Sequence, residues 1–244
     1  MRLRYDLHLH SCLSPCGSDD MTPNNLVNMA ALLGYDLIAV TDHNACGNAA
    51  AVLQAAGRAG LLAAPGMELC TEEEAHVVCL FPALEAALEF ESLVRRRSMP
   101  LKNRPEIFGR QLLMDGDDRL LGEEERMLIS AAQIGAEEAA CEARRLGGAA
   151  FPAHVDKNSY SILASLGDIP PEPGFRAAEI SPAGDAEALL ARCPALGGML
   201  LLTNSDAHYL ENMRDPGPWL DLPEKSLACL ISALNGEISI KWSL

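Results

Sequence analysis

Six histidines are the residues whose types and spacing point most directly to chemistry. They stand at positions His8, His10, His43, His76, His154 and His208. His8 and His10 lie in an alternating segment, residues 3–10, so both imidazoles point to the same side of a strand, about 7 Å apart along it. Two neutral imidazoles facing one way are suited to chelating a divalent metal. The pair alone is modest evidence, because surface histidines on an edge strand would have the same spacing.

Other metal-capable side chains fall at similar topological positions. They come directly after predicted strands: His43, Glu68, His154, Asp206 and His208. These predicted strands cover residues 37–41, 61–64, 149–153 and 199–203, with Glu68 reached across a predicted turn at 65–67. In barrel folds the C-terminal ends of the strands meet at one rim and carry the active site. His76 opens its strand instead of ending it, so we expect that strand to run antiparallel and begin at the same rim.

The elements that position these residues alternate between strand and helix, which indicates a parallel sheet or barrel. Helices are predicted at residues 22–34, 49–59, 84–97, 136–146, 185–192 and 223–234. Further strands are predicted at residues 3–10, 75–81, 176–180 and 238–242. The first helix has the clearest signals, with Thr22 as N-cap, Pro23 in its first turn and Gly34 as its stop.

One segment, about residues 98–133, does not follow the alternation. It contains two prolines, an Asp-Gly-Asp-Asp turn at 115–118 and a charged run at 123–126. Residues 111–114 and 119–121 form a possible hairpin. We interpret the segment as a small inserted subdomain.

Composition limits the classes of function. Acidic residues outnumber basic ones by 34 to 19, which gives a formal net charge of −15. Such a surface repels a nucleic acid backbone, and the densest basic run, at 95–97, suits a helix C-terminus without any ligand. We therefore predict that duplex nucleic acid is not a partner. A small anionic substrate attracted by bound metal remains compatible with this charge.

Cysteines and apolar runs indicate the environment of the protein. The eight cysteines are scattered, mostly within apolar runs, which favours reduced, buried thiols over a disulfide framework. The apolar runs are far shorter than a membrane span, and residues 2–6 lead directly into a charged strand instead of a secretion signal. The sequence predicts a cytoplasmic protein without a membrane partner.

Several motifs together resemble those of a known family. They are DLHLHS at 6–11, TDHN at 41–44, GME at 66–68, His154 and SDAH at 205–208. In this order they resemble the motifs of the PHP (polymerase and histidinol phosphatase) family, from about residue 5 to about 210 with a gap at the insertion. The resemblance implies a distorted (β/α)7 TIM-like barrel. It also implies a single PHP domain over residues 1–244, with about 98–133 as an inserted subdomain or cap.

The resemblance further implies a cluster of two or three divalent ions, zinc, manganese or iron, at the strand ends. The first metal would have four ligands: His8, His10, Glu68 and Asp206. The second would share Glu68 and have two further ligands, His76 and His154. The third would have His43 and His208.

The third metal site needs another ligand from the loop after Ser11, where relatives place Asp or His. The expected position lies near Pro15 and Cys16, and proline cannot coordinate a metal. Asp20 is the first choice, Cys16 the second and Asp19 the third. Both aspartates would equally well stabilise the N-terminus of the following helix, and a buried thiol is the more common role for such a cysteine. A cysteine ligand would favour zinc.

Neighbouring metal ions activate water and stabilise both the attacking and the leaving oxygen, so the protein needs no nucleophile of its own. Accordingly, the sequence contains no nucleophile elbow and no P-loop. The predicted catalytic residues are Asp206, Glu68 and His208, with Asp206 the nearest candidate for proton transfer.

The candidate substrate contacts are Lys157, Asn44 and Arg214, although each is more often an ordinary solvated residue. Asp6 and Asp42 precede histidines and are candidates for orienting imidazoles. The leading hypothesis is a metal-dependent phosphoesterase acting on a small phosphorylated molecule, such as a nucleotide or a sugar or amino-alcohol phosphate. The alternatives are a PHP-type exonuclease and a metal-binding module without turnover.

Overall fold

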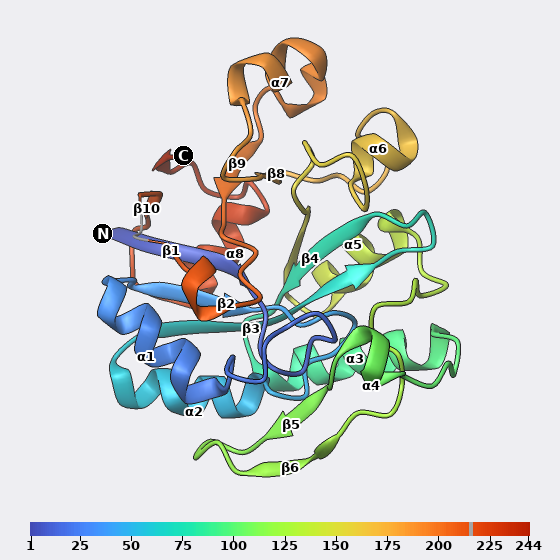
Figure 1. Ribbon diagram of the computed structural model, residues 1–244. Helices are drawn as coiled ribbons and strands as arrows, with labels where there is room; N and C mark the ends of the chain where they lie inside the picture. Colours follow the sequence, from blue (N-terminus) through green and yellow to red (C-terminus); the bar gives the residue numbers. More distant parts are fainter. Residues whose placement is uncertain (215–216) are drawn as a thin grey trace.

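Strands and helices alternate along most of the chain, as the sequence predicts (Figure 1). The computed structural model describes residues 1–214 and 217–244. The strands are β1 (Arg2–Leu9), β2 (Leu37–Val40), β3 (Leu62–Cys70), β4 (His76–Leu80), β5 (Leu112–Met114), β6 (Leu120–Glu123), β7 (Ala149–Pro152), β8 (Ala177–Ile180), β9 (Leu200–Thr203), β10 (Trp219–Asp221) and β11 (Lys241–Ser243). The α-helices are α1 (Pro23–Leu33), α2 (Ala49–Ala59), α3 (Leu84–Arg97), α4 (Pro105–Phe108), α5 (Ala136–Arg145), α6 (Ile162–Leu166), α7 (Ala186–Arg192) and α8 (Leu227–Leu234).

Seven strands form one curled sheet in the order β11-β10-β1-β2-β3-β4-β7. β1, β2 and β3 run parallel, whereas β4 is antiparallel to both β3 and β7. The reversal of β4 confirms the expectation that His76, at the start of its strand, reaches the rim where the parallel strands end. The short strand β10, which pairs with β1, was not predicted from the sequence.

β8 and β9 form a separate parallel pair that continues the curve of the sheet. The Val155 N–H after β7 donates to the Glu179 carbonyl of β8 at 2.8 Å, and the His10 N–H after β1 donates to the Ala207 carbonyl after β9 at 3.0 Å. A buried apolar cluster, which includes Leu7, is covered by α8 and takes side chains from β1, β2, β3, β4, β7, β8, β9 and β10. The structure thus confirms an α/β fold with a curled sheet. In the described residues, single backbone hydrogen bonds such as those of Val155 and His10 join β8 and β9 to the sheet, and no full ladder does.

The first helix shows why the local predictions succeed. The Thr22 hydroxyl accepts the Asn25 N–H, Pro23 occupies the first turn, and Gly34 ends α1 with a φ of 83°. That backbone conformation is easy for glycine and costly for residues with a Cβ. The helix packs through its apolar face beside α2, and both cover the same outer side of the sheet (Figure 1).

The predicted turn at 65–67 is wrong. β3 continues through these residues to Cys70, so Glu68 lies within the strand and pairs with Val78 of β4. Gly66 makes this possible, because a Cβ at this position would lie 2.6 Å from the Cys79 carbonyl oxygen. The Pro-Gly dipeptide therefore serves a close approach of two strands here instead of a chain reversal.

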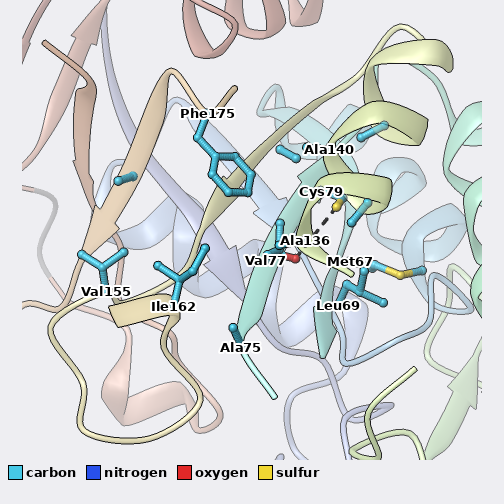
Figure 2. Packing of buried hydrophobic residues seen from close by; sticks show 14 of the residues in the cluster. Met67, Leu69, Ala75, Val77, Cys79, Ala136, Ala140, Val155, Ile162 and Phe175 are labelled. Carbon is cyan, nitrogen blue, oxygen red and sulfur yellow. Dashed lines mark hydrogen bonds between the residues drawn. The ribbon is translucent and has the colours of Figure 1, made fainter. Parts of the chain in front are cut away.

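The outer face of β3 and β4 carries a second apolar cluster that holds the sheet against α3 and α5. Figure 2 shows Met67, Leu69, Val77 and Cys79 from these strands, with the small residues of α5 packed against them. On the other side of the view, three further members of the cluster, Val155, Ile162 and Phe175, come from the segment after β7. This packing fixes the strand ends that carry Glu68, His76 and His154.

The segment around residues 98–133 contains α4 and the predicted hairpin, β5 paired antiparallel with β6. It lies beside the loop after β1, where the Leu112 N–H donates to the Cys12 carbonyl at 2.8 Å. Its turn contacts α1 and α2 through Asp118, which accepts the Thr22 hydroxyl at 2.6 Å, and through Asp117, 3.4 Å from Arg58. Among the described residues, no helix has the length and apolar character needed to cross a bilayer.

Candidate metal centre

Glu68 lies at the centre of the histidine cluster. Its Oε1 lies 3.2 Å from His8 Nε2, 2.8 Å from His76 Nδ1 and 3.1 Å from His154 Nε2. Its Oε2 lies 3.3 Å from His10 Nε2 and 3.0 Å from His43 Nδ1. The strand ends therefore bring five histidines around one buried carboxylate.

Asp206 completes the same cluster from the loop after β9. Its Oδ1 lies 3.4 Å from His8 Nε2 and 3.3 Å from His10 Nε2. His208 stacks on His10 with ring centroids 3.9 Å apart. All six histidines of the chain thus gather in one place.

Three overlapping groups bring possible metal-ligating atoms within 4.8 Å of one another. The groups are His8, His10, Glu68 and Asp206; His43, Glu68 and His76; and His10, His43 and His208. The first group coincides with the ligand set implied for the first metal. His154 reaches the centre through its 3.1 Å contact with Glu68.

The donor atoms fit metal ions better than they fit one another. Each histidine keeps one buried ring nitrogen without a hydrogen-bond partner in the described residues, an arrangement that costs free energy unless another group accepts the lone pair. Ligand atoms about 2.0–2.1 Å from a tetrahedral zinc lie about 3.3–3.4 Å apart. The four contacts of His8 and His10 with Glu68 and Asp206 span 3.2–3.4 Å.

Hydrogen bonds behind the histidines set their tautomers. His8 Nδ1 lies 2.8 Å from a carboxylate oxygen of Glu179, which can only accept, so Nδ1 carries the proton and Nε2 is free to ligate. His10 Nδ1 lies 2.8 Å from Ser14 Oγ, whose hydroxyl donates to Asp42 at 2.7 Å. His10 Nε2 is thereby free as well. Asp42 thus acts on His10, through Ser14, and not on the histidine beside it.

Glu179 was not predicted from the sequence. It is a buried carboxylate in the apolar strand β8, and besides His8 it accepts the Asn204 side-chain amide at 2.7 Å and the His154 N–H at 3.2 Å. A glutamate inside a short apolar strand was the available signal, because charged side chains are almost never fully buried without partners. In the described residues Asp6, the other predicted partner of an imidazole, instead accepts the backbone N–H groups of His8 and of Ser205 in the loop of Asp206.

Three residues of the centre have unusual backbone conformations. Asn44, His154 and Asp206 have φ values of 50°, 28° and 53°. A positive φ costs free energy in residues with a Cβ, and such residues concentrate at functional sites. Here they turn the chain sharply at the strand ends and aim His154 and Asp206 at the cluster.

Charge within the cluster shifts several pKa values. Burial lowers the pKa of His8, but Glu179 and Glu68 raise it more, and the net shift is well upward. Burial alone would raise the pKa of Glu68, but the surrounding imidazoles hold it well below its usual range. Burial lowers the pKa of His43 to about 4 and that of His208 to about 3. His43 and His208 are therefore neutral at pH 7, the form that ligates metals.

A pocket of about 210 Å³ opens onto the cluster. Besides the histidines and carboxylates, four residues line it: Cys16, Lys157, Ser159 and Tyr160. The ring of Tyr160 stacks on His76 with centroids 5.0 Å apart, and the ammonium group of Lys157 pairs with Asp206 Oδ2. The segment after β7 therefore forms one wall of the pocket and places Lys157, a predicted substrate contact, in its lining.

The structure does not bring two of the predicted substrate contacts to this pocket. The Asn44 amide is occupied by backbone groups: it donates to the Leu128 and Ser130 carbonyls and accepts the Cys70 N–H. Arg214 lines a different pocket, on the side of Tyr35 and Asp6. These positions lie outside the lining of the metal pocket.

The loop after Ser11 places its three candidate ligands differently. Asp20 is exposed, and none of the three ligand groups of the described residues includes it. Asp19 forms an exposed ion pair with Arg110 at 3.2 Å. Cys16 is not in these groups either, but it lines the pocket, and its Sγ lies 3.5 Å from His43 Nε2. The second choice from the sequence is thus the one beside the cluster.

The curled α/β sheet with a histidine and carboxylate cluster at one rim defines a class of metal-binding proteins built on barrel-like sheets. The PHP domain model matches residues 6–137, which is more than half of the chain. The chain therefore belongs to the PHP domain family, as the sequence motifs predict. Members of this family are typically metal-dependent hydrolases, which supports a hydrolase here.

Solved structures share the fold at low sequence identity. Endonuclease Q from Pyrococcus furiosus, a lesion-specific endonuclease, matches with a TM-score of 0.68 and 20% identity over 99% of this chain. The match covers 58% of that protein, so the chain spans little more than half its length. A candidate metal-dependent phosphoesterase from Bifidobacterium adolescentis matches with a TM-score of 0.58 and 19% identity over 84% of this chain and 87% of its own. No curated protein gave a match.

The exclusion of duplex nucleic acid as a partner is wrong. One structure with this fold is a complex of Endonuclease Q with a 27-mer duplex that has an abasic lesion at the active site. A net charge of −15 is a sum over the whole chain, whereas the field at a metal site is dominated by the bound cations. Overall charge therefore does not decide whether a phosphodiester can reach such a centre.

Proposed function

We propose that this protein is a metal-dependent phosphoester hydrolase. The observation that carries the proposal is the convergence of six imidazoles on Glu68 and Asp206, with a lysine ammonium group at the same pocket. Imidazole and carboxylate donors suit zinc, manganese and iron. The lysine is not a metal ligand, so its positive charge is available to bind a phosphate group.

Two or three ions would be held by the residues of this cluster. The first ion has four ligands: His8, His10, Glu68 and Asp206. Glu68 is shared with a second ion, together with His76 and His154, and His43 and His208 belong to a third. When bound, such ions lower the pKa of water and stabilise the charge that develops on phosphoryl oxygens.

The side chains of the pocket orient the substrate and manage protons. Lys157 pairs with Asp206, so an arriving phosphate would compete with that carboxylate for the ammonium group. Release from Lys157 leaves Asp206 Oδ2 facing the pocket, where it can accept a proton from the attacking water. Glu68 and His208, which line the same pocket, are the ligands beside it in this proposal.

The size of the pocket supports a small substrate. Its volume of about 210 Å³ is below the ~300–1,000 Å³ of sites that enclose drug-sized ligands. A phosphate group and a short polar body fit this space, as in a nucleotide or a sugar or amino-alcohol phosphate. The exposed ring of Tyr160, already stacked on His76, offers a flat surface for that body.

We also propose the finer architecture that the resemblance implies. In this proposal β1, β2, β3, β4, β7, β8 and β9 act as a (β/α)7 barrel. Residues 1–244 form a single domain, and about 98–133 form an insertion into it. The shared apolar cluster inside the seven strands supports this view. A cytoplasmic location stays a prediction.

The test is release of inorganic phosphate from a panel of small phosphorylated molecules. Purified protein is stripped of metal and reloaded separately with zinc, manganese or iron. We expect release with at least one substrate and metal, and loss of release in the His8→Ala variant. No release from any substrate by metal-loaded protein would reject the proposal and favour a metal-binding module without turnover.

A second candidate function is a nuclease, favoured by the fold shared with Endonuclease Q over 99% of this chain. The test uses single-stranded oligonucleotides and a duplex with one abasic site, beside an intact duplex of the same sequence. Cleavage confined to the lesion-containing duplex would favour a lesion nuclease. Stepwise shortening of single strands would favour an exonuclease.

A further inference from the structure

Cys16 lies where its thiol faces a buried imidazole at the edge of the metal cluster. Its Sγ is 3.5 Å from His43 Nε2, and both residues line the pocket with His208. In a tetrahedral site with a metal–sulfur distance of about 2.3 Å and a metal–nitrogen distance of about 2.0–2.1 Å, the two ligand atoms lie about 3.6 Å apart. The observed separation matches that of two ligands on one ion.

The neighbouring histidines point independently to a metal at this position. His10 and His43 are buried, and His10 Nε2 and His43 Nδ1 have no hydrogen-bond partner in the described residues, while His43 Nε2 is the nitrogen that faces Cys16. His208 Nε2 likewise has no hydrogen-bond partner among the residues described. Possible donor atoms of these three histidines lie within 4.8 Å of one another. The thiol thus stands beside a set of imidazoles that is itself arranged for a cation.

The loop that carries Cys16 is held in place by the backbone. The Ser14 and Gly17 N–H groups close successive turns by donating to the Ser11 and Ser14 carbonyls at 3.0 and 2.9 Å, and the Ser18 N–H donates to the His208 carbonyl at 2.9 Å. A Cβ at Gly17 would lie 2.9 Å from the Ser11 carbonyl oxygen, so the turn needs glycine. These bonds tie Cys16 to the chain segment of His208.

The insertion supports the same loop from the outside. Gly109 approaches Pro15 so closely that a Cβ there would lie 2.3 Å from the Pro15 carbonyl oxygen. Arg110 pairs with Asp19, and the Leu112 N–H donates to the Cys12 carbonyl at 2.8 Å. In this structure the insertion therefore braces the Cys16 loop, and none of its residues lines the metal pocket.

We propose that Cys16 is a metal ligand: its thiolate, with His43, holds one ion of the cluster. Binding releases the thiol proton to solvent as the sulfur–metal bond forms. A thiolate favours zinc, cobalt or iron over magnesium and manganese, so this position is selective for softer ions. The inference rests on the proposed metal centre and specifies one of its sites.

Cobalt(II) reports on the ligand directly, because a thiolate ligand gives it a charge-transfer absorption in the near ultraviolet. The full chain is stripped of metal and titrated with cobalt(II), and absorption is followed with metal content per chain. We expect the native protein to show the band. Cys16→Ser should lose the band and bind one cobalt fewer per chain. Cys141→Ser, which removes another exposed thiol, should keep the band and the full cobalt content.

Cys16→Asp keeps the position occupied by an oxygen donor. We expect this variant to retain the bound ion without the charge-transfer band, and to shift its preference from zinc towards manganese. A band that survives in Cys16→Ser, or full cobalt loading of the native protein with no band, would overturn the proposal.

Alkylation of the native protein tests the same point without a substitution. Cys16 and Cys141 are both exposed, so iodoacetamide should modify both in the metal-free chain, as read by mass spectrometry. Metal should slow modification of Cys16 and leave Cys141 unchanged. Equal rates at Cys16 with and without metal would overturn the proposal. Phosphate release is not used in any of these readouts, so the proposed hydrolysis can fail while the cysteine ligand stands.

Discussion

At the scale of single residues, the centre depends on groups that touch no substrate. Glu179 bonds the ring nitrogen of His8 that faces away from the cluster, and Ser14, whose hydroxyl donates to Asp42, bonds that of His10. They fix the protonated nitrogen and the orientation of each ring. A metal site of this kind is built as much by these partners as by the ligands themselves.

Glu179→Gln should weaken metal binding by about 10–100-fold, the range usual for loss of a partner behind a ligand histidine. The amide keeps the volume of the side chain but presents a donor where His8 or Asn204 needs an acceptor. Competition with a chromophoric chelator measures the affinity. Glu187→Gln, on the exposed side of α7, removes the same charge and should leave the metal affinity unchanged. Equal affinity in both variants would contradict the role given to Glu179.

Lys157→Ala should impair catalysis while leaving metal content intact. The ammonium group pairs with Asp206 at the pocket and is not among the possible ligands. If it binds phosphate, its loss raises KM for a phosphorylated substrate by about 10-fold or more, since hydrogen bonds to charged groups contribute about 1.5–3 kcal/mol. Steady-state kinetics measure this on a substrate found in the phosphate-release panel, and Lys225→Ala, an exposed lysine far along the chain, is the control.

At the scale of elements, the sequence predicted most of the framework because the signals are local. Capping by Thr22 and the stop at Gly34 define α1, and apolar runs define strands such as β2. What failed depends on distant neighbours. The residues 65–67 resemble a turn until β4 is known to pair with them, and Glu179 gains its meaning from His8, which lies 171 positions away.

The same reasoning applies within the site. The convergence of the histidines could be predicted from sequence because strand ends meet. His8 and His10 lie at the end of β1, three others follow strand ends, and His76 begins a strand that runs the other way. The choice between Asp20 and Cys16 could not be predicted, since it depends on the fold of a short loop whose turns are closed by backbone bonds. Residue type alone favoured the carboxylate there.

Gly66→Ala should destabilise the pairing of β3 with β4. The added methyl group would lie 2.6 Å from the Cys79 carbonyl oxygen and 2.6 Å from a Leu80 methyl group, so one strand must shift. Overpacking of this kind costs about 1–3 kcal/mol of unfolding free energy. Urea unfolding measures it. The matched control is Gly57→Ala in α2, where a Cβ meets nothing within 4 Å and helix propensity favours alanine, so stability should stay equal or rise.

At the scale of the whole molecule, the buried cluster is a cost that bound metal offsets. Five imidazoles and Glu68 are buried together, with His208 and Asp206 half-buried beside them, and several ring nitrogens have no partner in the described residues. Burying polar groups without partners disfavours folding. Cations that bind the folded chain alone therefore stabilise it, independently of any reaction, and the acidic surface does not oppose their entry.

Removal of metal should therefore lower the thermal stability of the protein. An ion present at 100 times its Kd adds about 2.7 kcal/mol at each independent site, so a chelator should reduce Tm by several degrees for each site emptied. Differential scanning calorimetry of matched metal-free and metal-loaded samples measures the difference. Zinc added back should restore the original Tm.

A variant with a weakened centre separates this linkage from a general effect of the chelator. His8→Ala should begin with a lower Tm and respond less to chelator than the native chain, because His8 contacts both Glu68 and Asp206. Arg145→Ala breaks exposed ion pairs on α5 and should respond to chelator as the native chain does. If metal-free and metal-loaded native protein unfold at one temperature, the cluster does not bind ions in the folded state, and its six histidines need another explanation.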